Sequence, residues 1–295
     1  MREEPPLTAT SAAVRAARQR VVRRELLTGL VRKDLKVKYQ GSVLGFAWSL
    51  ANPLLTLAVY SFVFGLVLKA GIPAFGFYLM CGLLLWNAFA TAVGSACAAV
   101  VANAGLVKKV PFPLGVLPLS SVAFAIVHYV LQLFVLVVVM VAFGEWRHWD
   151  AGLLLLPPAL LVALTFMIAI SFLVAALNVR YRDTQHIVDV VLLAGMWLNP
   201  IVYSATQLRA RLEKHHLWDV YFLNPMADVV VAAQRALYGT GRTFQSGTGK
   251  QEVLPDSGLM FYVTRLGVGF AVSLVVLVAT YRLYNRMSAD FAEEL

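Results

Sequence analysis

Charged residues are scarce in this chain. Only 14% of its 295 residues are Asp, Glu, Lys or Arg, whereas 60% are hydrophobic. A soluble domain carries about a quarter charged residues, so this composition excludes an ordinary soluble domain and indicates a membrane protein. Acidic residues are scarcer than basic ones, 16 against 25. The cations lie at the ends of apolar runs, which is typical of contact with anionic lipid headgroups and not with nucleic acid.

Cysteines and metal-binding patterns are also few. The two cysteines, Cys81 and Cys97, lie in one apolar run. On a continuous helix their Cα atoms would be about 24 Å apart, which is too far for a disulfide. The sequence has no C-x-x-C motif and no regular His/Cys spacing. We therefore expect no metal site in this chain.

Two further absences concern the energy source that a transporter would use. No series of acidic residues crosses the apolar runs, and Asp189, near the end of one run, comes closest. This argues against coupling to an ion gradient, and His128 is predicted to be a hydrogen-bonded packing residue rather than a proton relay. The segment SGTGKQ at 246–251 lacks the glycine spacing of a phosphate-binding loop and is predicted to be a flexible outer loop. We therefore expect this chain to bind no nucleotide or other cofactor.

Long apolar runs dominate what is present. A membrane span needs about 20 apolar residues, and the sequence predicts six spans, at 45–68, 77–101, 115–143, 152–178, 187–205 and 260–283. The N-terminal segment lacks the apolar core of a signal peptide, so the first run is expected to stay in the membrane. Sixteen of the 25 Lys and Arg residues fall on the side of the two termini and nine on the other. The positive-inside rule therefore predicts cytoplasmic termini.

The segments outside the spans complete an all-α membrane fold. Asn224–Gly239 predicts a short helix, because Pro225 follows Asn224 and a glycine stands at the end. This helix belongs to a re-entrant segment, about 206–239, between spans five and six, which requires burial in protein or contact with a polar cavity. The predicted units are a flexible tail at 1–19, a cytoplasmic amphipathic helix at 20–40, a six-span domain at 41–285 and a cytoplasmic tail at 286–295.

Residues 20–40 are predicted to lie along the membrane surface. Leu26, Leu27, Leu30 and Leu35 share one side of the helix, and most of the basic residues lie elsewhere around it. A solvated segment that only signals topology is an open alternative. Four cations, Arg32, Lys33, Lys36 and Lys38, occur within seven positions, and no charged residue follows until Lys69.

Several sequence blocks occur in an order that is typical of one transporter family. Residues 24–39 fit R-[ED]-L-x-x-x-L-x-x-[KR]-D-L-K-x-[KR]-Y, and S-x-L-G-x-x-W and N-P-L follow. The later blocks are ANAGLVKKVPFPLGVLPLS, NVRYRD, NPIVY and NPMADVVVAAQRALYG. Over most of residues 20–285 the chain resembles the permease subunits of ATP-binding cassette exporters for lipid-linked polysaccharides, such as O-antigen, teichoic acid and galactan. Leu114 departs from the pattern, because a basic residue is common there.

The resemblance implies a homodimer of six-span subunits in the bacterial plasma (inner) membrane. Two copies of a separate ATPase subunit would hold ATP and magnesium, and the cargo would be a polyprenyl-diphosphate-linked polysaccharide exported from the cytoplasm. The turn between spans two and three would be a coupling helix seated on the ATPase, comprising Asn103, Gly105, Leu106, Lys108, Lys109, Pro111, Phe112 and Pro113. The gate and headgroup-binding residues would be Arg32, Lys33, Asp34, Lys36, Lys38 and Tyr39.

The cargo that the resemblance implies suits a basic helix that runs into a neutral span. The cations would attract and hydrogen-bond the diphosphate, and hydroxyl, amide and aromatic groups of the neutral region would contact the sugars. Interface anchoring of aromatic residues and helix packing of small residues are the open alternatives. The channel-lining candidates are Ser42, Trp48, Ser49, Asn52, Thr56 and Tyr60, together with Trp197 and Tyr203 of the fifth span.

Two alternatives belong to other functional classes. An exporter of drugs or small lipids would share the six spans but not the N-terminal signature. A membrane-embedded polyprenyl glycosyltransferase would need a cluster of carboxylates near the headgroups, for which Asp183 and Asp189 are the candidates.

Overall fold

The computed structural model describes residues 9–42, 45–69, 71–109, 113–215, 217–246, 249–255 and 258–295. Its first half contains α1 (Ala9–Tyr39), η1 (Gly45–Ala47), α2 (Trp48–Tyr60), the π-helical η2 (Ser61–Val67), α3 (Phe75–Ala102), α4 (Ala104–Lys109) and α5 (Val116–Ala142). Then follow η3 (Glu145–His148), η4 (Ala151–Leu155), α6 (Leu156–Arg180), α7 (Thr184–Leu198), α8 (Ala205–Lys214), α9 (Trp218–Tyr221) and α10 (Pro225–Leu237). The strands β1 (Thr243–Ser246) and β2 (Gly249–Glu252) precede α11 (Leu259–Met287) and α12 (Phe291–Glu294).

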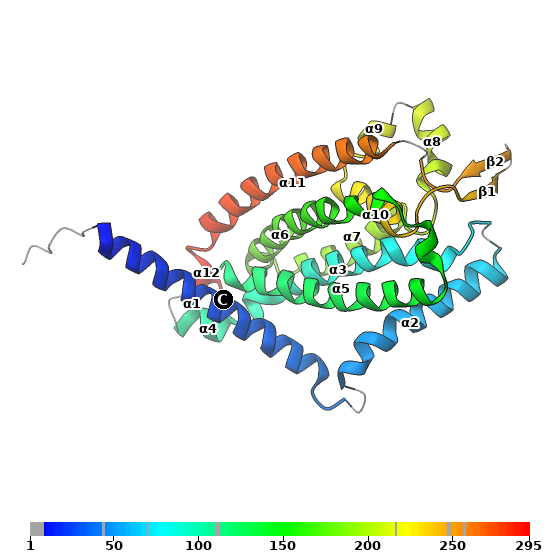
Figure 1. Ribbon diagram of the computed structural model, residues 1–295. Coiled ribbons are helices and arrows are strands. Elements are labelled where there is room, and N and C mark those ends of the chain that lie inside the picture. Colours follow the sequence, from blue (N-terminus) through cyan, green and yellow to red (C-terminus); the bar gives the residue numbers. More distant parts are fainter. Residues whose placement is uncertain are drawn as a thin grey trace, which may run out of the picture.

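Long apolar helices form the body of the protein. Within the described residues, five helical stretches are long and apolar enough to cross a membrane: Trp48–Val67, Phe75–Ala102, Val116–Ala142, Ala151–Arg180 and Leu259–Met287. Figure 1 shows α3, α5 and α6 side by side, with α11 along α6. These five stretches agree with five of the six predicted spans and confirm an all-α membrane architecture.

The fifth predicted span, 187–205, is wrong in its C-terminal end. Helix α7 ends at Leu198, and Asn199 is extended with ψ of 150°. The cause is Pro200, because a residue before proline avoids the helical region. With 15 residues, α7 is about 22 Å long, which is shorter than a hydrocarbon core of about 30 Å.

Helix α10 lies inside the protein rather than on its surface. All 13 of its residues are buried, and it packs against α3, α6, α11 and η4. Gly82 of α3 permits this approach, because a Cβ atom there would lie 2.9 Å from Cγ1 of Val230. The guanidinium of Arg235 donates to both carboxylate oxygens of Asp150 at 2.7 Å, which pairs a buried charge.

Two further segments differ from expectation. Helix α1 begins at Ala9, so at least residues 9–19 are helical where a flexible tail was predicted. Residues 243–246 and 249–252 pair as antiparallel strands, with Phe244 opposite Gln251. A flexible outer loop was predicted there, and the all-α description needs this one exception.

The two ends of the bundle differ in the helices and strands that lie there. At one end α1, α4 and α12 gather, and at the other end lie α8, α9, β1 and β2 (Figure 1). A separate apolar cluster occupies the first end, and Leu30 of α1 and Leu295 both pack against it. The N-terminal helix and the C-terminal turn therefore lie at the same end of the molecule.

Candidate functional site

The last residue of α1 contacts two other helices. After α1 the chain turns at Gly41, whose φ of +75° favours glycine, and continues into α2. The hydroxyl of Tyr39 contacts the hydroxyl of Ser49 in α2 and lies 3.1 Å from Nε2 of His128 in α5. Tyr39, a predicted gate residue, thus contacts both Ser49, a predicted channel residue, and His128, which was predicted to be a hydrogen-bonded packing residue.

A polar hollow of about 150 Å³ surrounds this contact. Cation, hydroxyl, amide and indole groups from α1, α2 and α5 face the same space. Its lining residues are Lys38, Tyr39, Trp48, Ser49, Asn52, His128 and Gln132. Five of these seven were predicted as gate or channel residues, whereas His128 and Gln132 were not. The signal for the two missed residues was their polarity within an otherwise apolar span.

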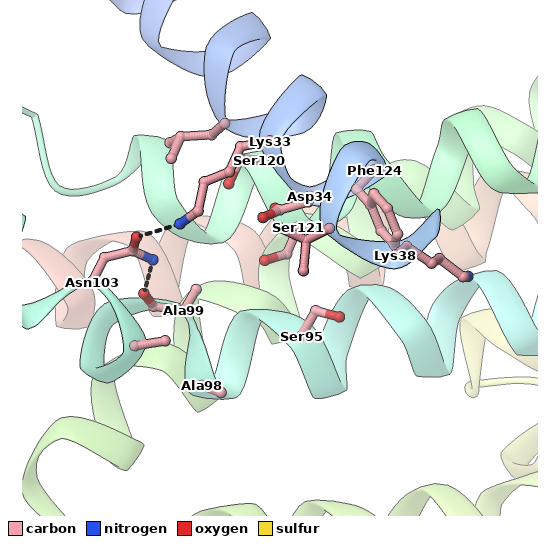
Figure 2. Close-up of a pocket in the computed structure, with 13 residues that line it drawn as sticks. Lys33, Asp34, Lys38, Ser95, Ala98, Ala99, Asn103, Ser120, Ser121 and Phe124 are labelled. Atoms are coloured by element: carbon pink, nitrogen blue, oxygen red, sulfur yellow. Dashed lines mark hydrogen bonds between the residues drawn. The ribbon is translucent and has the colours of Figure 1, made fainter. Parts of the chain in front are cut away.

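A second hollow, of about 310 Å³, lies between α1, α3 and α5 (Figure 2). Lys38 lines both hollows, so the two are neighbours, and its ammonium lies 5.4 Å from the centre of the Phe124 ring. We call the two together the polar groove. Besides Lys38, the polar side chains of the second hollow are those of Lys33, Asp34, Ser95, Asn103, Ser120 and Ser121.

Burial shifts the pKa values of two side chains on α1. Desolvation raises the pKa of the Asp34 carboxyl above its ordinary value, and the nearby Lys33 ammonium opposes that shift. Desolvation also lowers the pKa of the Lys38 ammonium. These side chains are therefore partly removed from water at the mouth of the groove.

Lys33 joins the groove to the predicted coupling turn. Its ammonium donates to Oδ1 of Asn103 at 3.2 Å, and the amide nitrogen of Asn103 donates to the carbonyl of Ala99 at 2.8 Å (Figure 2). The backbone carbonyl of Asn103 in turn accepts from the N–H groups of Leu106 and Val107, at 2.9 and 3.1 Å. Asn103 thus contacts α1 through its side chain and the first turn of α4 through its backbone carbonyl.

The predicted coupling residues lie in α4 or on either side of it along the chain. Gly105 and Lys108 are exposed, Leu106 is half-buried, and Val107, which was not predicted, is buried. Lys109 is the last residue of α4, and Pro113 begins the return to α5. Pro111 and Phe112 lie outside the described residues. Among the α4 residues whose burial is described, Val107 is therefore the buried one, and the others are exposed or half-buried.

Several predicted site residues are not part of the polar groove. Arg32 and Lys36 are exposed on other sides of α1. Ser42 is exposed, and its hydroxyl accepts from the N–H of Gly45 at 3.0 Å. The hydroxyl of Tyr203 donates to the carbonyl of Leu198 at 3.1 Å, beyond the end of α7. Thr56, Tyr60 and Trp197 also line neither hollow.

The groove presents binding groups. Ammonium, amide and hydroxyl groups are the donors that proteins use for phosphate, and hydroxyl groups with aromatic faces suit sugar. Among the described residues, no group of three or more His, Cys, Asp or Glu could hold a metal ion. Asp183 and Asp189, the candidates for an enzymatic carboxylate pair, are both exposed at the beginning of α7.

Comparison with known proteins places this arrangement in a family. The family model for the ABC-2 type transporter matches residues 25–238. The O-antigen export system permease protein RfbA of Myxococcus xanthus is 33% identical over 96% of this chain and 100% of its own length. Two such proteins of Klebsiella pneumoniae are 28% and 29% identical over 92% of this chain and 95% of their own length. The predicted resemblance to transporter permeases is confirmed, and the chain belongs to the ABC-2 type transporter family.

Proposed function

We propose that this chain is the channel-forming permease subunit of an exporter for a polyprenyl-diphosphate-linked polysaccharide. It acts as a homodimer with two copies of a separate ATPase subunit, which bind ATP and magnesium. The cargo moves from the cytoplasm across the bacterial plasma membrane, and its class is galactan, O-antigen or a teichoic-acid-like polymer. Three relatives named as O-antigen export permeases, each aligned over more than nine-tenths of this chain, support this proposal.

The observation that carries the proposal is the position of the polar groove. It lies where the basic helix α1 meets the apolar bundle, and it combines Lys33 and Lys38 with serine, amide and aromatic side chains. A diphosphate headgroup at the cytoplasmic surface would meet the cations, and the sugars would follow along the neutral groups. Leu26, Leu27 and Leu30 of α1 are half-buried, and Leu30 packs against the apolar cluster at this end of the bundle, so α1 contacts the protein there.

The proposed topology has six spans with both termini in the cytoplasm. Helix α7 is the short fifth span, and α8, α9 and α10 form the re-entrant segment on the outer side. Burial of all of α10 supports this assignment, because non-spanning backbone at membrane depth must be enclosed by protein. Helix α4 then faces the cytoplasm and transmits ATPase motion to the spans.

A gene deletion in the native host tests the function. We expect polyprenyl-linked glycan to accumulate inside the cell, where a membrane-impermeant label does not reach it, and wild-type permease to restore surface labelling. Replacement of 108–113 by a Gly/Ser linker should not restore it. Surface labelling that persists in the deletion strain would contradict the proposal.

A small-lipid exporter is the second candidate, because one apolar hollow favours it. About 410 Å³ of space lies between α3, α6 and α7, lined mainly by apolar side chains such as Trp86, Phe166 and Val191. The same deletion strain separates the two functions. Loss of a phospholipid or drug export activity with normal glycan export would favour the small-lipid exporter.

A further inference from the structure

A second apolar cluster lies under α4, apart from the main core. We call it the end cluster: Val100, Val107, Leu117, Phe172, Ala175, Ala176, Val179, Tyr284 and Phe291. Its members come from α3, α4, α5, α6, α11 and α12, so residues far apart in sequence meet at this end of the bundle. Val107 is the member that α4 contributes.

The C-terminal part of the chain supplies two of the three aromatic members of the end cluster, Tyr284 and Phe291. Tyr284 is 1% exposed and Phe291 is fully buried. Their ring centres are 5.5 Å apart in an edge-to-face arrangement, and Tyr284 lies 5.0 Å from the ring of Phe172 in α6. Helix α12, which carries Phe291, packs against α4.

Tyr284 also holds the chain that returns from α4. Its hydroxyl donates to the backbone carbonyl of Leu114 at 3.0 Å. Beside this bond lies a hollow of about 360 Å³, lined by residues 113–116 and by the end of α11. Because that side of the return turn is open, a hydrogen bond to Leu114 restricts its movement.

Helix α4 depends on such external contacts. It has six residues, and helices of this length are not stable alone in water. Gly105 and Lys108 are exposed, so within the described part of α4 the buried anchor is Val107. The orientation of α4 therefore depends on the surface on which Val107 rests.

We propose that Tyr284 and Phe291 are positioning residues that hold α4 in the orientation in which a partner ATPase receives it. The proposal rests on the proposed function, because α4 must be the coupling segment for its orientation to matter. The C-terminal turn thus acts on coupling through packing, without any contact between Phe291 and the cargo.

Three variants in the complex purified from native membranes test this role. Tyr284→Phe removes only the hydroxyl, and Phe291→Ala removes the buried ring. Tyr281→Phe is the matched control, because it deletes the hydroxyl of an exposed tyrosine one turn away. Hydrogen exchange of residues 104–109 reports the rigidity of α4, and the ratio of glycan exported to ATP hydrolysed reports coupling.

We expect exchange in α4 to rise about fivefold in Tyr284→Phe, the factor that corresponds to one lost hydrogen bond. In Phe291→Ala it should rise about tenfold or more, because a large buried ring is lost. The export-to-hydrolysis ratio should fall in both variants, and Tyr281→Phe should change neither readout. If Phe291→Ala does not fold, Tyr284→Phe decides the question.

Unchanged exchange and an unchanged ratio in the folded variants would overturn the inference. A parallel replacement of 108–113 by a Gly/Ser linker separates this failure from that of the proposed function. If the linker abolishes coupling while Tyr284→Phe and Phe291→Ala do not, only the positioning role is wrong. If the linker leaves coupling intact, the coupling role that the proposed function gives to α4 is wrong, and this inference fails with it.

Discussion

The ammonium of Lys33 in α1 lies 3.2 Å from Oδ1 of Asn103, the residue immediately before α4. This contact connects the polar groove with the segment proposed to receive motion from an ATPase. Residues 70 positions apart in sequence thereby place the helix proposed to bind cargo and the turn proposed to couple to the ATPase against each other. The consequence is that movement of α4 is expected to move the groove.

Loss of this contact should impair export without loss of ATPase binding. Lys33→Ala removes both the charge and the donor, whereas Lys33→Gln retains a donor to Asn103. We expect the export rate to fall about fivefold in Lys33→Ala, the effect of one hydrogen bond, and less in Lys33→Gln. The rate is measured by surface labelling of exported glycan. An equal loss in both variants would show that the charge, and not the contact, matters.

Substitutions of Lys38 and Lys36 form a matched pair of variants that tests where the headgroup binds. Lys38 lines both hollows of the groove, and Lys36 lines neither. Lys38→Gln should weaken the binding of polyprenyl diphosphate in detergent micelles about tenfold, because hydrogen bonds to charged groups contribute about 1.5–3 kcal/mol. Lys36→Gln should change the affinity by less than about twofold. A larger effect of Lys36→Gln would place the headgroup outside the groove.

Asp34 should make stability fall as pH rises. Burial raises its pKa in the folded protein, so the folded state binds more protons than the unfolded state between the two pKa values. Above the folded pKa the buried carboxylate is a cost, which Asp34→Asn removes. We expect Asp34→Asn to have a higher Tm than wild type at pH 8, and the two to converge below about pH 4. A lower Tm of the variant at pH 8 would indicate a stabilising partner for the carboxylate.

Asp150 should show the opposite dependence. Two hydrogen bonds from Arg235 hold the pKa of Asp150 below its ordinary value. The stability that this ion pair contributes is therefore fully present above the unfolded-state pKa of about 3.9. It is lost as pH falls through the folded-state pKa of Asp150. Asp150→Asn should lower the free energy of unfolding at pH 7 by about 2 kcal/mol, less than for a fully buried pair because Asp150 is half exposed.

The pair of Asp219 and Arg265 is the control for this measurement. Asp219 is 83% exposed, so Asp219→Asn should cost at most about 0.5 kcal/mol. Similar losses in Asp150→Asn and Asp219→Asn would contradict a special role for the buried guanidinium of Arg235.

Local sequence signals predicted the long helices well. The apolar runs at 77–101 and 115–143 correspond to α3 and α5 because a membrane span depends on length and hydropathy alone. The end of α7 was missed although Asn199–Pro200 carried the signal. The span was predicted to continue because apolar residues follow Pro200, although the residue before a proline avoids the helical conformation.

The candidate site was predictable only in part. Tyr39, Ser49 and Asn52 stood out because they are polar residues at the border of a neutral span. His128 and Gln132 were missed because their meeting with Tyr39 depends on packing between helices far apart in sequence. The end cluster was missed for the same reason, since no local pattern links Phe291 to Val107.

The central claim is that this chain works as a permease with a separate ATPase. A tagged protein purified from native membranes in mild detergent, with mass spectrometry of the proteins and lipids that accompany it, tests this most directly. The account predicts a P-loop ATPase in equal amount and a bound polyprenyl-linked glycan, whose composition would identify the cargo. The absence of an ATPase, under conditions in which a known exporter of this kind keeps its own, would contradict the account.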